Sequence, residues 1–201
     1  AEGRYPSLTG TNVARDFVEL PSQLMENWGF EPAWLHTFAR HWKTGEAIPD
    51  ALVERLVAAR NYHAAYFQVR QLRFGLLDLA WHTQRTLRQA QGPDVLKVEQ
   101  EALAECAVLP DIPGSCISTA FHHIFDGGYS AGYYSYKWAE ALEADAFSLF
   151  RERGIFDPAT AASFRENILS KGGSEDEALL YRRFRGHDPD PQALLKKLEI
   201  I

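Results

Sequence analysis

The chain has 201 residues, of which 46% are hydrophobic and 24% are charged, and its formal net charge at pH 7 is −6. A chain of this size and composition can bury a sizeable core, as ordinary globular proteins do. The acidic balance and the lack of a basic stripe exclude a typical nucleic-acid binder. Polar or charged residues interrupt every apolar run well before bilayer length, so no membrane span is expected.

The cysteines and the first residues indicate the cellular compartment. Cys106 and Cys116 are too few for a disulfide scaffold, and we interpret them as buried thiols in a reducing compartment. The first residues contain neither an initiator Met nor the apolar core of a signal peptide, which is typical of a cut through a longer chain. The cytoplasm is the expected location.

The amino-terminal third is expected to be helical after a polar start. Residues 1–12 are polar and contain glycine, so they are predicted to form a loop that leads into the first helix. That helix should cover about 13–29, with Asn12 as a possible N-cap. Pro21 lies inside it and predicts a kink or a break. A shorter helix is expected over about 32–42.

The longest helical segment is expected to begin at Asp50 and to end at Gly92-Pro93. Apolar residues recur along it at steps of three and four, which predicts a single apolar stripe made by Leu52, Leu56, Ala59, Tyr62, Tyr66, Val69, Leu72, Leu76 and Leu79. Five arginines lie off that stripe, and we interpret them as a solvated face: Arg55, Arg60, Arg70, Arg73 and Arg85.

The next part of the chain changes character. Asp94 is predicted to cap a helix of about 94–107. Residues 109–128 contain several Pro and Gly residues, and we interpret them as an irregular, functional connection with a short helical turn. A long helix should then cover about 129–153, with Gly154 after its end.

Three shorter helices are expected in the remainder. One should start at Asp157-Pro158 and end near Gly172, and the next should start at a capping box formed by Ser174 and Glu177. Gly186 should end that helix, and the last one should run from Asp190-Pro191 through Leu198. Together the elements predict an all-α fold, in which residues 1–201 form a single helical domain.

The first candidate site surrounds Glu19. Asp16, Glu19 and Gln23 are spaced by three and four residues, so on the expected helix they would share one face. Phe17, Val18, Leu20 and Leu24 would form the other face. Spacing alone favours the interpretation of the three polar groups as the solvated side of an amphipathic helix.

The second candidate site lies in the segment from His122 to Trp138. It combines a His pair, a Gly pair and the tyrosines Tyr129, Tyr133, Tyr134 and Tyr136. Glycines allow a sharp bend and a close approach of substrate, while phenols and neutral imidazole can donate hydrogen bonds to a carbonyl or an oxyanion. The alternative from composition alone is that the tyrosines only pack and that the His pair forms a capped turn.

These two segments, D-F-V-E-x-P-S-Q at residues 16–23 and H-I-x-x-G-G-Y-x-x-x-Y-Y-x-Y at residues 123–136, resemble the thimet oligopeptidase / oligopeptidase A family of zinc peptidases. The resemblance covers nearly the whole chain and implies the carboxy-terminal part of a helical, zincin-type catalytic domain. It implies that Glu19 is a zinc ligand. From that role we infer that Asp16 accepts a hydrogen bond from a ligand imidazole.

The same resemblance assigns roles to the second segment. It implies that His123, Tyr129 and Tyr136 are catalytic groups that bind substrate and stabilise the oxyanion. Tyr133, Gly127 and Gly128 would line the substrate-binding surface. Zn²⁺ would be the cofactor of the intact enzyme, and short peptides would be its substrates.

One part of the family pattern is missing from this chain. No His is followed by Glu, so the H-E-x-x-H motif, which supplies two imidazoles and a general base, is absent. We therefore expect a fragment that is inactive alone, binds zinc poorly, and pairs with the missing amino-terminal part of the same enzyme. Apolar surface left uncovered would favour self-association. The alternative is a non-catalytic helical module that binds a peptide or a partner.

Overall fold

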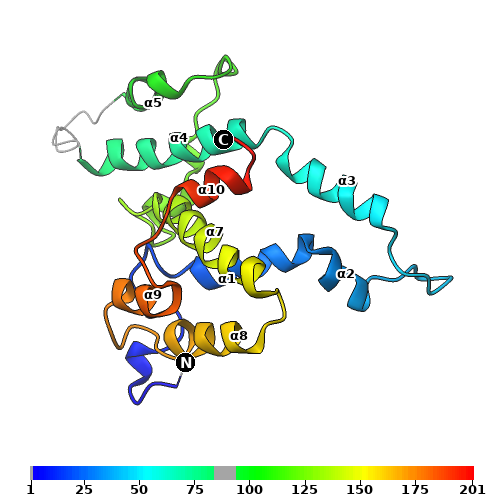
Figure 1. The fold of residues 1–201 in the computed structure, drawn as a ribbon. Helices are drawn as coiled ribbons and strands as arrows, with labels where there is room; N and C mark the ends of the chain where they lie inside the picture. Colours follow the sequence, from blue (N-terminus) through cyan, green and yellow to red (C-terminus); the bar gives the residue numbers. More distant parts are fainter. Residues whose placement is uncertain (1, 84–93) are drawn as a thin grey trace. The chain divides into compact units, whose positions relative to one another are not determined.

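The computed structural model describes residues 2–83 and 94–201, and these residues are predominantly helical (Figure 1). Extended pairing within them is limited to an isolated antiparallel bridge between Arg40 and Ala47. The predicted all-α class is therefore confirmed. The chain divides into two compact units, one made of Ala1–Ala64 and Trp138–Ile201 and the other of Ala65–Lys137.

The first unit contains most of the helices. Its elements in chain order are η1 Pro6–Leu8, α1 Leu20–Glu26, η2 Asn27–Phe30, α2 Pro32–Phe38, α3 Asp50–Asn61, most of α7 Ser135–Arg153, α8 Pro158–Phe164, the π-helical η6 Arg165–Leu169, α9 Glu177–Arg185 and α10 Gln192–Lys197. The second unit contains nearly all of α4 Ala64–Thr83, and then α5 Val95–Leu103, η4 Ala104–Cys106, η5 Ser118–Ala120 and α6 His122–Phe125.

The core of the first unit forms around the middle of α7. Trp28 places its ring edge-on to Phe147 and Phe150, with ring centroids 4.8 and 5.0 Å apart. The Trp28 indole N–H donates to the Ile155 carbonyl at 3.2 Å, which satisfies the polar atom of this large side chain. The other buried residues of this cluster come from α1, α7, α8, η6 and α9, with Phe17 just before α1: Phe17, Leu20, Leu24, Leu142, Ala146, Leu149, Phe164, Ile168, Leu180, Tyr181 and Phe184.

The first helix begins later than predicted. Its helical residues start at Leu20, and residues 15–19 form successive turns, so the predicted start near 13 and the Asn12 cap are wrong. Pro21 explains the difference, because a proline ring within a helix clashes with the carbonyl four residues earlier, here Phe17. The Phe17 carbonyl instead accepts the Leu20 N–H at 3.1 Å. Pro21 therefore lies in the first helical turn, where its missing N–H costs nothing.

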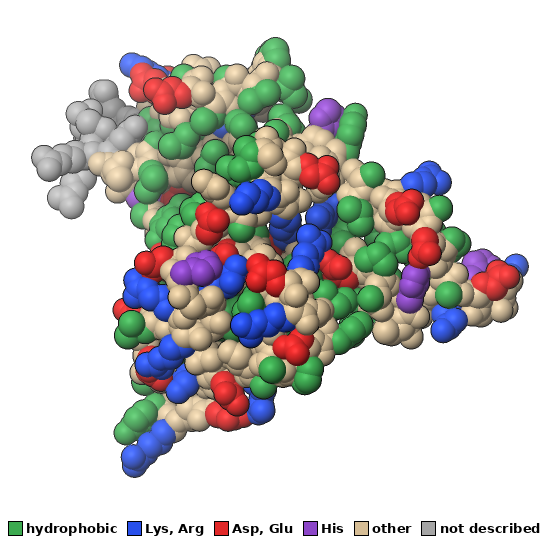
Figure 2. Space-filling model, viewed as in Figure 1, with side chains coloured by type: hydrophobic (Ala, Val, Ile, Leu, Met, Phe, Trp, Pro, Cys, Tyr) green, Lys and Arg blue, Asp and Glu red, His purple; other side chains and the backbone are tan. Residues whose placement is uncertain are grey.

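The predicted long helix after Asp50 is two helices, α3 and α4, separated at Tyr62 and His63. His63 has a φ of 58°, a left-handed conformation that ends α3. The apolar stripe is also not buried as a unit, since Leu52, Leu72 and Tyr62 are 50%, 50% and 70% exposed. Hydrophobic side chains are accordingly visible on the surface in Figure 2. The expected end at Gly92-Pro93, and Arg85, lie outside the described residues.

The interpretation of the arginines as a solvated face is wrong for two of them. Arg60 is half-buried, with its guanidinium 4.6 Å from the centre of the Phe30 ring. Arg73 has a side chain only 14% exposed and pairs with Asp111 at 2.9 Å. Spacing along a helix cannot identify such partners, because they come from segments distant in the sequence.

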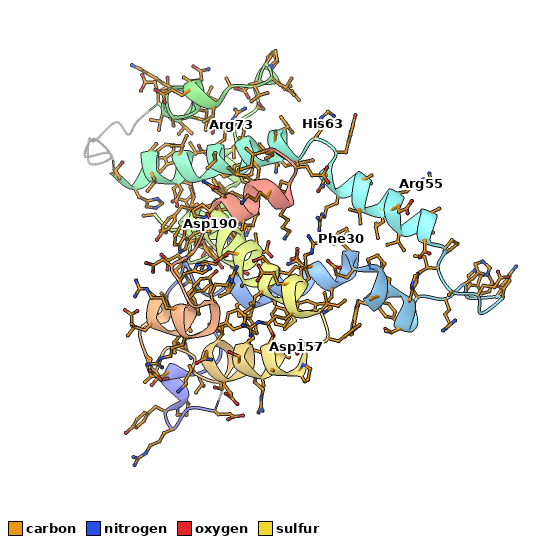
Figure 3. The ribbon with its side chains drawn as sticks, viewed as in Figure 1. Phe30, Arg55, His63, Arg73, Asp157 and Asp190 are labelled. Atoms are coloured by element: carbon orange, nitrogen blue, oxygen red, sulfur yellow. The ribbon has the colours of Figure 1, made fainter. Side chains whose placement is uncertain are left out.

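Most predicted helix ends are confirmed. Asp94 accepts the N–H groups of Leu96 and Lys97, and Asp157, labelled in Figure 3, accepts that of Thr160. Gly154 and Gly186 follow α7 and α9 with φ values of 110° and 91°, which only glycine adopts readily.

Two other helix starts differ. The capping box of Ser174 and Glu177 is wrong, because Asp176 caps α9 and the Glu177 carboxylate accepts the Ala14 N–H at 2.9 Å. The helix expected from 129 begins at Ser135, and turns occupy the residues before it. Of the helices that the structure describes, none combines the length and apolarity required to cross a bilayer.

The second unit has its own core and a buried acid. Leu77 and Trp81 of α4 pack with Val98 and Leu103 of α5 and with Phe121 and Ile124.

The buried acid is Glu99, which is 8% exposed. Its carboxylate accepts hydrogen bonds from the backbone N–H groups of Ile117 and Ser118, at 2.9 and 2.8 Å, and from the Ser118 hydroxyl at 2.6 Å. Both cysteines are free thiols and half-buried.

Glu99 makes the stability of this unit sensitive to acid. Burial opposes ionisation, but hydrogen bonds from Ser118 and Ile117 outweigh it and hold the pKa of the Glu99 carboxyl below its ordinary value of 4.5. A depressed pKa in the folded state means that the stabilisation is present above the ordinary value and is lost as pH falls through the lower, folded value.

Glu99→Gln should therefore lower the free energy of unfolding at about pH 7 by about 1–3 kcal/mol. The reason is that the glutamine NH₂ group replaces one carboxylate oxygen and cannot accept the hydrogen bonds donated to it. The deficit relative to the unmodified chain should shrink as pH falls below 4.5. Thermal unfolding followed over that range measures both effects. Glu101→Gln, on the exposed side of the same helix with Lys97 at 3.8 Å, is the control and should change little. A pH-independent deficit would contradict the assignment.

Candidate functional site

The segment between α6 and α7 folds back on itself through Gly127. The Gly127 N–H donates to the His122 carbonyl at 2.8 Å, and the Tyr129 N–H donates to the His123 carbonyl at 3.0 Å. A Cβ at position 127 would lie 2.7 Å from the His123 Cα, so only glycine fits this bend. Gly128 has a φ of 82°, which also favours glycine. The Gly pair thus brings Tyr129 back beside His123.

A buried carboxylate, that of Asp78 on α4, holds the rest of this segment. Asp78 is 1% exposed, and its two oxygens accept the N–H groups of Ala131 and Tyr133, each at 2.8 Å. His82, one turn later, places its Nδ1 2.8 Å from the same carboxylate. Ala131 has a positive φ of 54°, which is uncommon for a residue with a Cβ and shows how firmly the segment is held. Sequence reasoning missed Asp78, although its signal was an acid within the apolar run 76–81.

The rings of His123, Tyr129, Tyr133 and Tyr136 come together in the second unit; we call these four residues the ring cluster. The His123 ring centre lies 6.2, 6.0 and 6.3 Å from those of Tyr129, Tyr133 and Tyr136. Tyr129 stacks on Tyr136 at 4.9 Å, and Tyr133 meets Tyr136 edge-on at 5.2 Å. His123 is exposed, whereas the three tyrosines are half-buried.

The tyrosines do not share one helix face, as the predicted helix from 129 would have required. Tyr129 lies just before the turn at residues 130–134, Tyr133 lies within that turn, and of the three only Tyr136 belongs to α7. The three tyrosine rings meet because the chain folds back on itself at the Gly pair, so residues before α7 lie next to a residue within α7.

Tyr133 is held by contacts outside the ring cluster. Its ring packs against Phe74 and Phe121, with centroids 5.6 and 5.1 Å apart, and its hydroxyl donates to the Gln71 side chain at 3.3 Å. Burial, followed by the neighbouring Tyr136, raises the pKa of Tyr133 above its ordinary value. The phenol therefore stays protonated near neutral pH and remains a hydrogen-bond donor. An imidazole and three phenols gathered in this way offer donors to carbonyl oxygens.

Glu19 and Asp16 belong to the first unit. Both are half-buried and both precede the helical residues of α1, so the predicted shared helix face of Asp16, Glu19 and Gln23 is wrong. Ser22 donates its hydroxyl to the Glu19 carboxylate at 3.1 Å. The buried side chains of Phe17 and Leu20 on either side of Glu19 fix its backbone in the core.

Zinc, the cofactor that the resemblance implies, needs more donors than Glu19. A catalytic zinc is held by three protein ligands and keeps a fourth position open. Within residues 2–83 and 94–201, no three His, Cys, Asp or Glu side chains gather in a way that could hold a metal ion. The described part of the chain therefore does not make a complete zinc site by itself.

Comparison with known proteins identifies the family. Residues 1–200 match the profile described as Peptidase family M3, so the chain belongs to peptidase family M3. It is 48% identical over 186 residues to oligopeptidase A of Escherichia coli (strain K12), covering 92% of this chain and 27% of that protein. It is 42% identical over 196 residues to dipeptidyl carboxypeptidase of the same organism, covering 98% of this chain and 29% of that protein.

A third relative gives the same result, since oligopeptidase A of Haemophilus influenzae is 44% identical over 189 residues, covering 94% of this chain and 28% of that protein. The chain spans less than a third of the length of these curated relatives. The resemblance to oligopeptidases is thus confirmed at the level of the family.

Asp78→Asn should loosen the segment that carries the ring cluster. An amide turned toward two N–H donors leaves one of them without an acceptor, which costs about 1–3 kcal/mol of local stability. Hydrogen exchange at the Ala131 and Tyr133 amides measures this opening. Asp126→Asn is the control, since the Asp126 side chain is 80% exposed and pairs with the exposed His122. Equal protection in both variants would show that Asp78 does not hold the segment.

Proposed function

We propose that this chain is a part of a zinc-dependent oligopeptidase that binds short peptides and supplies one ligand of the catalytic metal. The observation that carries the proposal is the ring cluster of His123, Tyr129, Tyr133 and Tyr136, whose members converge through a bend that only glycine permits. Membership of peptidase family M3 supports the reaction class. The activity belongs to the intact enzyme, of which this chain is one portion.

In this proposal the ring cluster binds the peptide carbonyl that is attacked by water. Tyr129 and Tyr136 donate their hydroxyls to that oxygen, and these hydrogen bonds strengthen as negative charge develops on it. His123, which is exposed, holds the amine that leaves. Tyr133 fixes the position of Tyr136, and Gly127 with Gly128 lets the peptide approach the backbone.

Glu19 is proposed as one of the zinc ligands, with Asp16 accepting a hydrogen bond from a ligand imidazole. The remaining ligands and the general base would come from the amino-terminal part of the same enzyme, which is the proposed partner of this chain. The cytoplasm is the proposed location. Relatives include an oligopeptidase and a dipeptidyl carboxypeptidase, so the proposal extends to either mode of cleavage.

The isolated chain should not hydrolyse peptides. With one proposed zinc ligand it lacks both a selective metal site and a general base. Titration with zinc in the presence of a fluorogenic peptide tests this, with intact oligopeptidase A of E. coli as the positive control. Zinc-dependent hydrolysis by this chain alone would refute the proposal. Peptide binding without hydrolysis, even after the amino-terminal part is supplied, would favour the non-catalytic binding module.

Tyr136→Phe in the intact enzyme should lower kcat by about 10²–10³, the usual cost of removing one oxyanion donor. KM and zinc content should change little, because the ring still packs against Tyr129 and Tyr133. Steady-state kinetics and metal analysis measure the two effects separately. Tyr62→Phe is the control, because Tyr62 is 70% exposed and lies outside the ring cluster. Unchanged kcat in Tyr136→Phe would remove this phenol from the oxyanion role.

A further inference from the structure

The second unit contains a cavity that the ring cluster does not occupy. It has a volume of about 310 Å³ and lies between α4 and the segment 108–117. This size is at the lower end of the range for small-ligand sites. Its walls combine apolar groups with three charged ones, including Val69, Arg70, Arg73, Phe74, Val108 and Asp111.

The two arginines of this cavity differ in how their charge is balanced. The Arg73 guanidinium, which extends from α4 (Figure 3), lies 2.9 Å from Asp111, and its side chain is only 14% exposed. Arg70 lies with its guanidinium 4.7 Å from the centre of the Phe74 ring. No carboxylate of the described residues pairs with Arg70. The cavity therefore holds one neutralised cation and one that is not neutralised.

One unneutralised guanidinium beside apolar walls favours a ligand that carries a single negative charge and an apolar group. A guanidinium presents a planar pair of N–H donors that matches the two oxygens of a carboxylate. A dianion such as a phosphate monoester would require the second cation, which Asp111 already neutralises. The apolar walls add burial for a side chain attached next to the carboxylate.

The cavity shares a wall with the ring cluster. Phe74 lines the cavity and also packs edge-on against Tyr133, with ring centroids 5.6 Å apart. The cavity and the ring cluster are therefore adjacent within the second unit, on either side of the Phe74 ring.

We propose that this cavity binds the free carboxylate and the apolar side chain of the carboxy-terminal residue of a peptide, with Arg70 as the carboxylate ligand. The inference rests on the proposed function, because that function makes a peptide the ligand. It goes further by naming the end of the peptide that is recognised and the residue that recognises it.

The test compares two ligands that differ only in charge, N-acetyl-alanyl-phenylalanine and its carboxy-terminal amide, titrated into this chain by isothermal calorimetry and NMR. The acid should bind about 10- to 100-fold more tightly than the amide, as expected for hydrogen bonds to a charged group. Arg70→Gln should bind both equally and at the level of the amide. Equal binding of the two ligands by the unmodified chain, or binding of neither, would overturn the proposal, as would a preference that survives in Arg70→Gln.

Two further variants keep the test decisive if the Arg70→Gln variant does not fold. Asp111→Asn removes the neutralising acid, so it should bind the acid more tightly and the amide no differently; weaker binding of the acid would contradict the charge argument. Arg55→Gln removes an exposed arginine from α3 and should leave the preference unchanged (Figure 3). Loss of the preference in Arg55→Gln as well would assign it to net charge and overturn the role of Arg70.

The failure of this inference can be told apart from failure of the proposed function. In the intact enzyme, Arg70→Gln should raise KM for peptides with a free carboxylate and leave amidated peptides unaffected. If the enzyme cleaves peptides but Arg70→Gln changes neither class, the inference fails and the peptidase stands. If the enzyme cleaves no peptide, the proposed peptidase function is wrong. The binding test then still shows whether the cavity prefers a carboxylate to an amide.

Discussion

The position of the ring cluster depends on one buried carboxylate, that of Asp78. A carboxylate removed from water is costly unless donors surround it. Here the donors are the N–H groups of Ala131 and Tyr133, together with the His82 ring. The segment supplies two of them in a conformation with a positive φ at Ala131. The bend at Gly127 then determines where Tyr129 lies, so a buried acid on a helix and a glycine turn together determine where three phenols and an imidazole meet.

The first unit positions its candidate residue by a different means. Glu19 lies between residues that are buried in an apolar core, and the aromatic rings of Trp28, Phe147 and Phe150 fill that core. Close packing limits the movement of the backbone that carries the carboxylate. In each unit the candidate site residues are therefore half-buried or exposed, while the groups that hold them are buried. Such a division lets a site keep its geometry and remain accessible.

Local signals in the sequence predicted the fold class and most helix ends, because a cap or a left-handed glycine depends on its neighbours alone. The Asp94 and Asp157 caps and Gly186 are of this kind. The sequence could not show that Glu177 accepts a hydrogen bond from Ala14, or that Asp78 holds Tyr133, since these partners are distant in the chain. For the candidate site, the motif predicted which residues gather in the ring cluster. It predicted the wrong geometry, because a helix was expected where the chain turns.

The arginines of α3 and α4 show why position on a helix is not enough to assign a role. All of them lie off the apolar stripe, yet Arg60 and Arg70 each meet an aromatic ring whereas Arg73 meets a carboxylate. Arg60 contacts the Phe30 ring, and its pKa is lowered because burial, and then Arg151, disfavour its charge. Arg73 is paired with Asp111, whereas Arg70 contacts the Phe74 ring and pairs with no carboxylate among the residues that the structure describes. An aromatic face attracts a cation without neutralising it, so Arg70 keeps its N–H groups available for an anion. Its surroundings therefore leave the Arg70 charge unpaired by any described carboxylate, which is the basis of the proposal that it binds an anion.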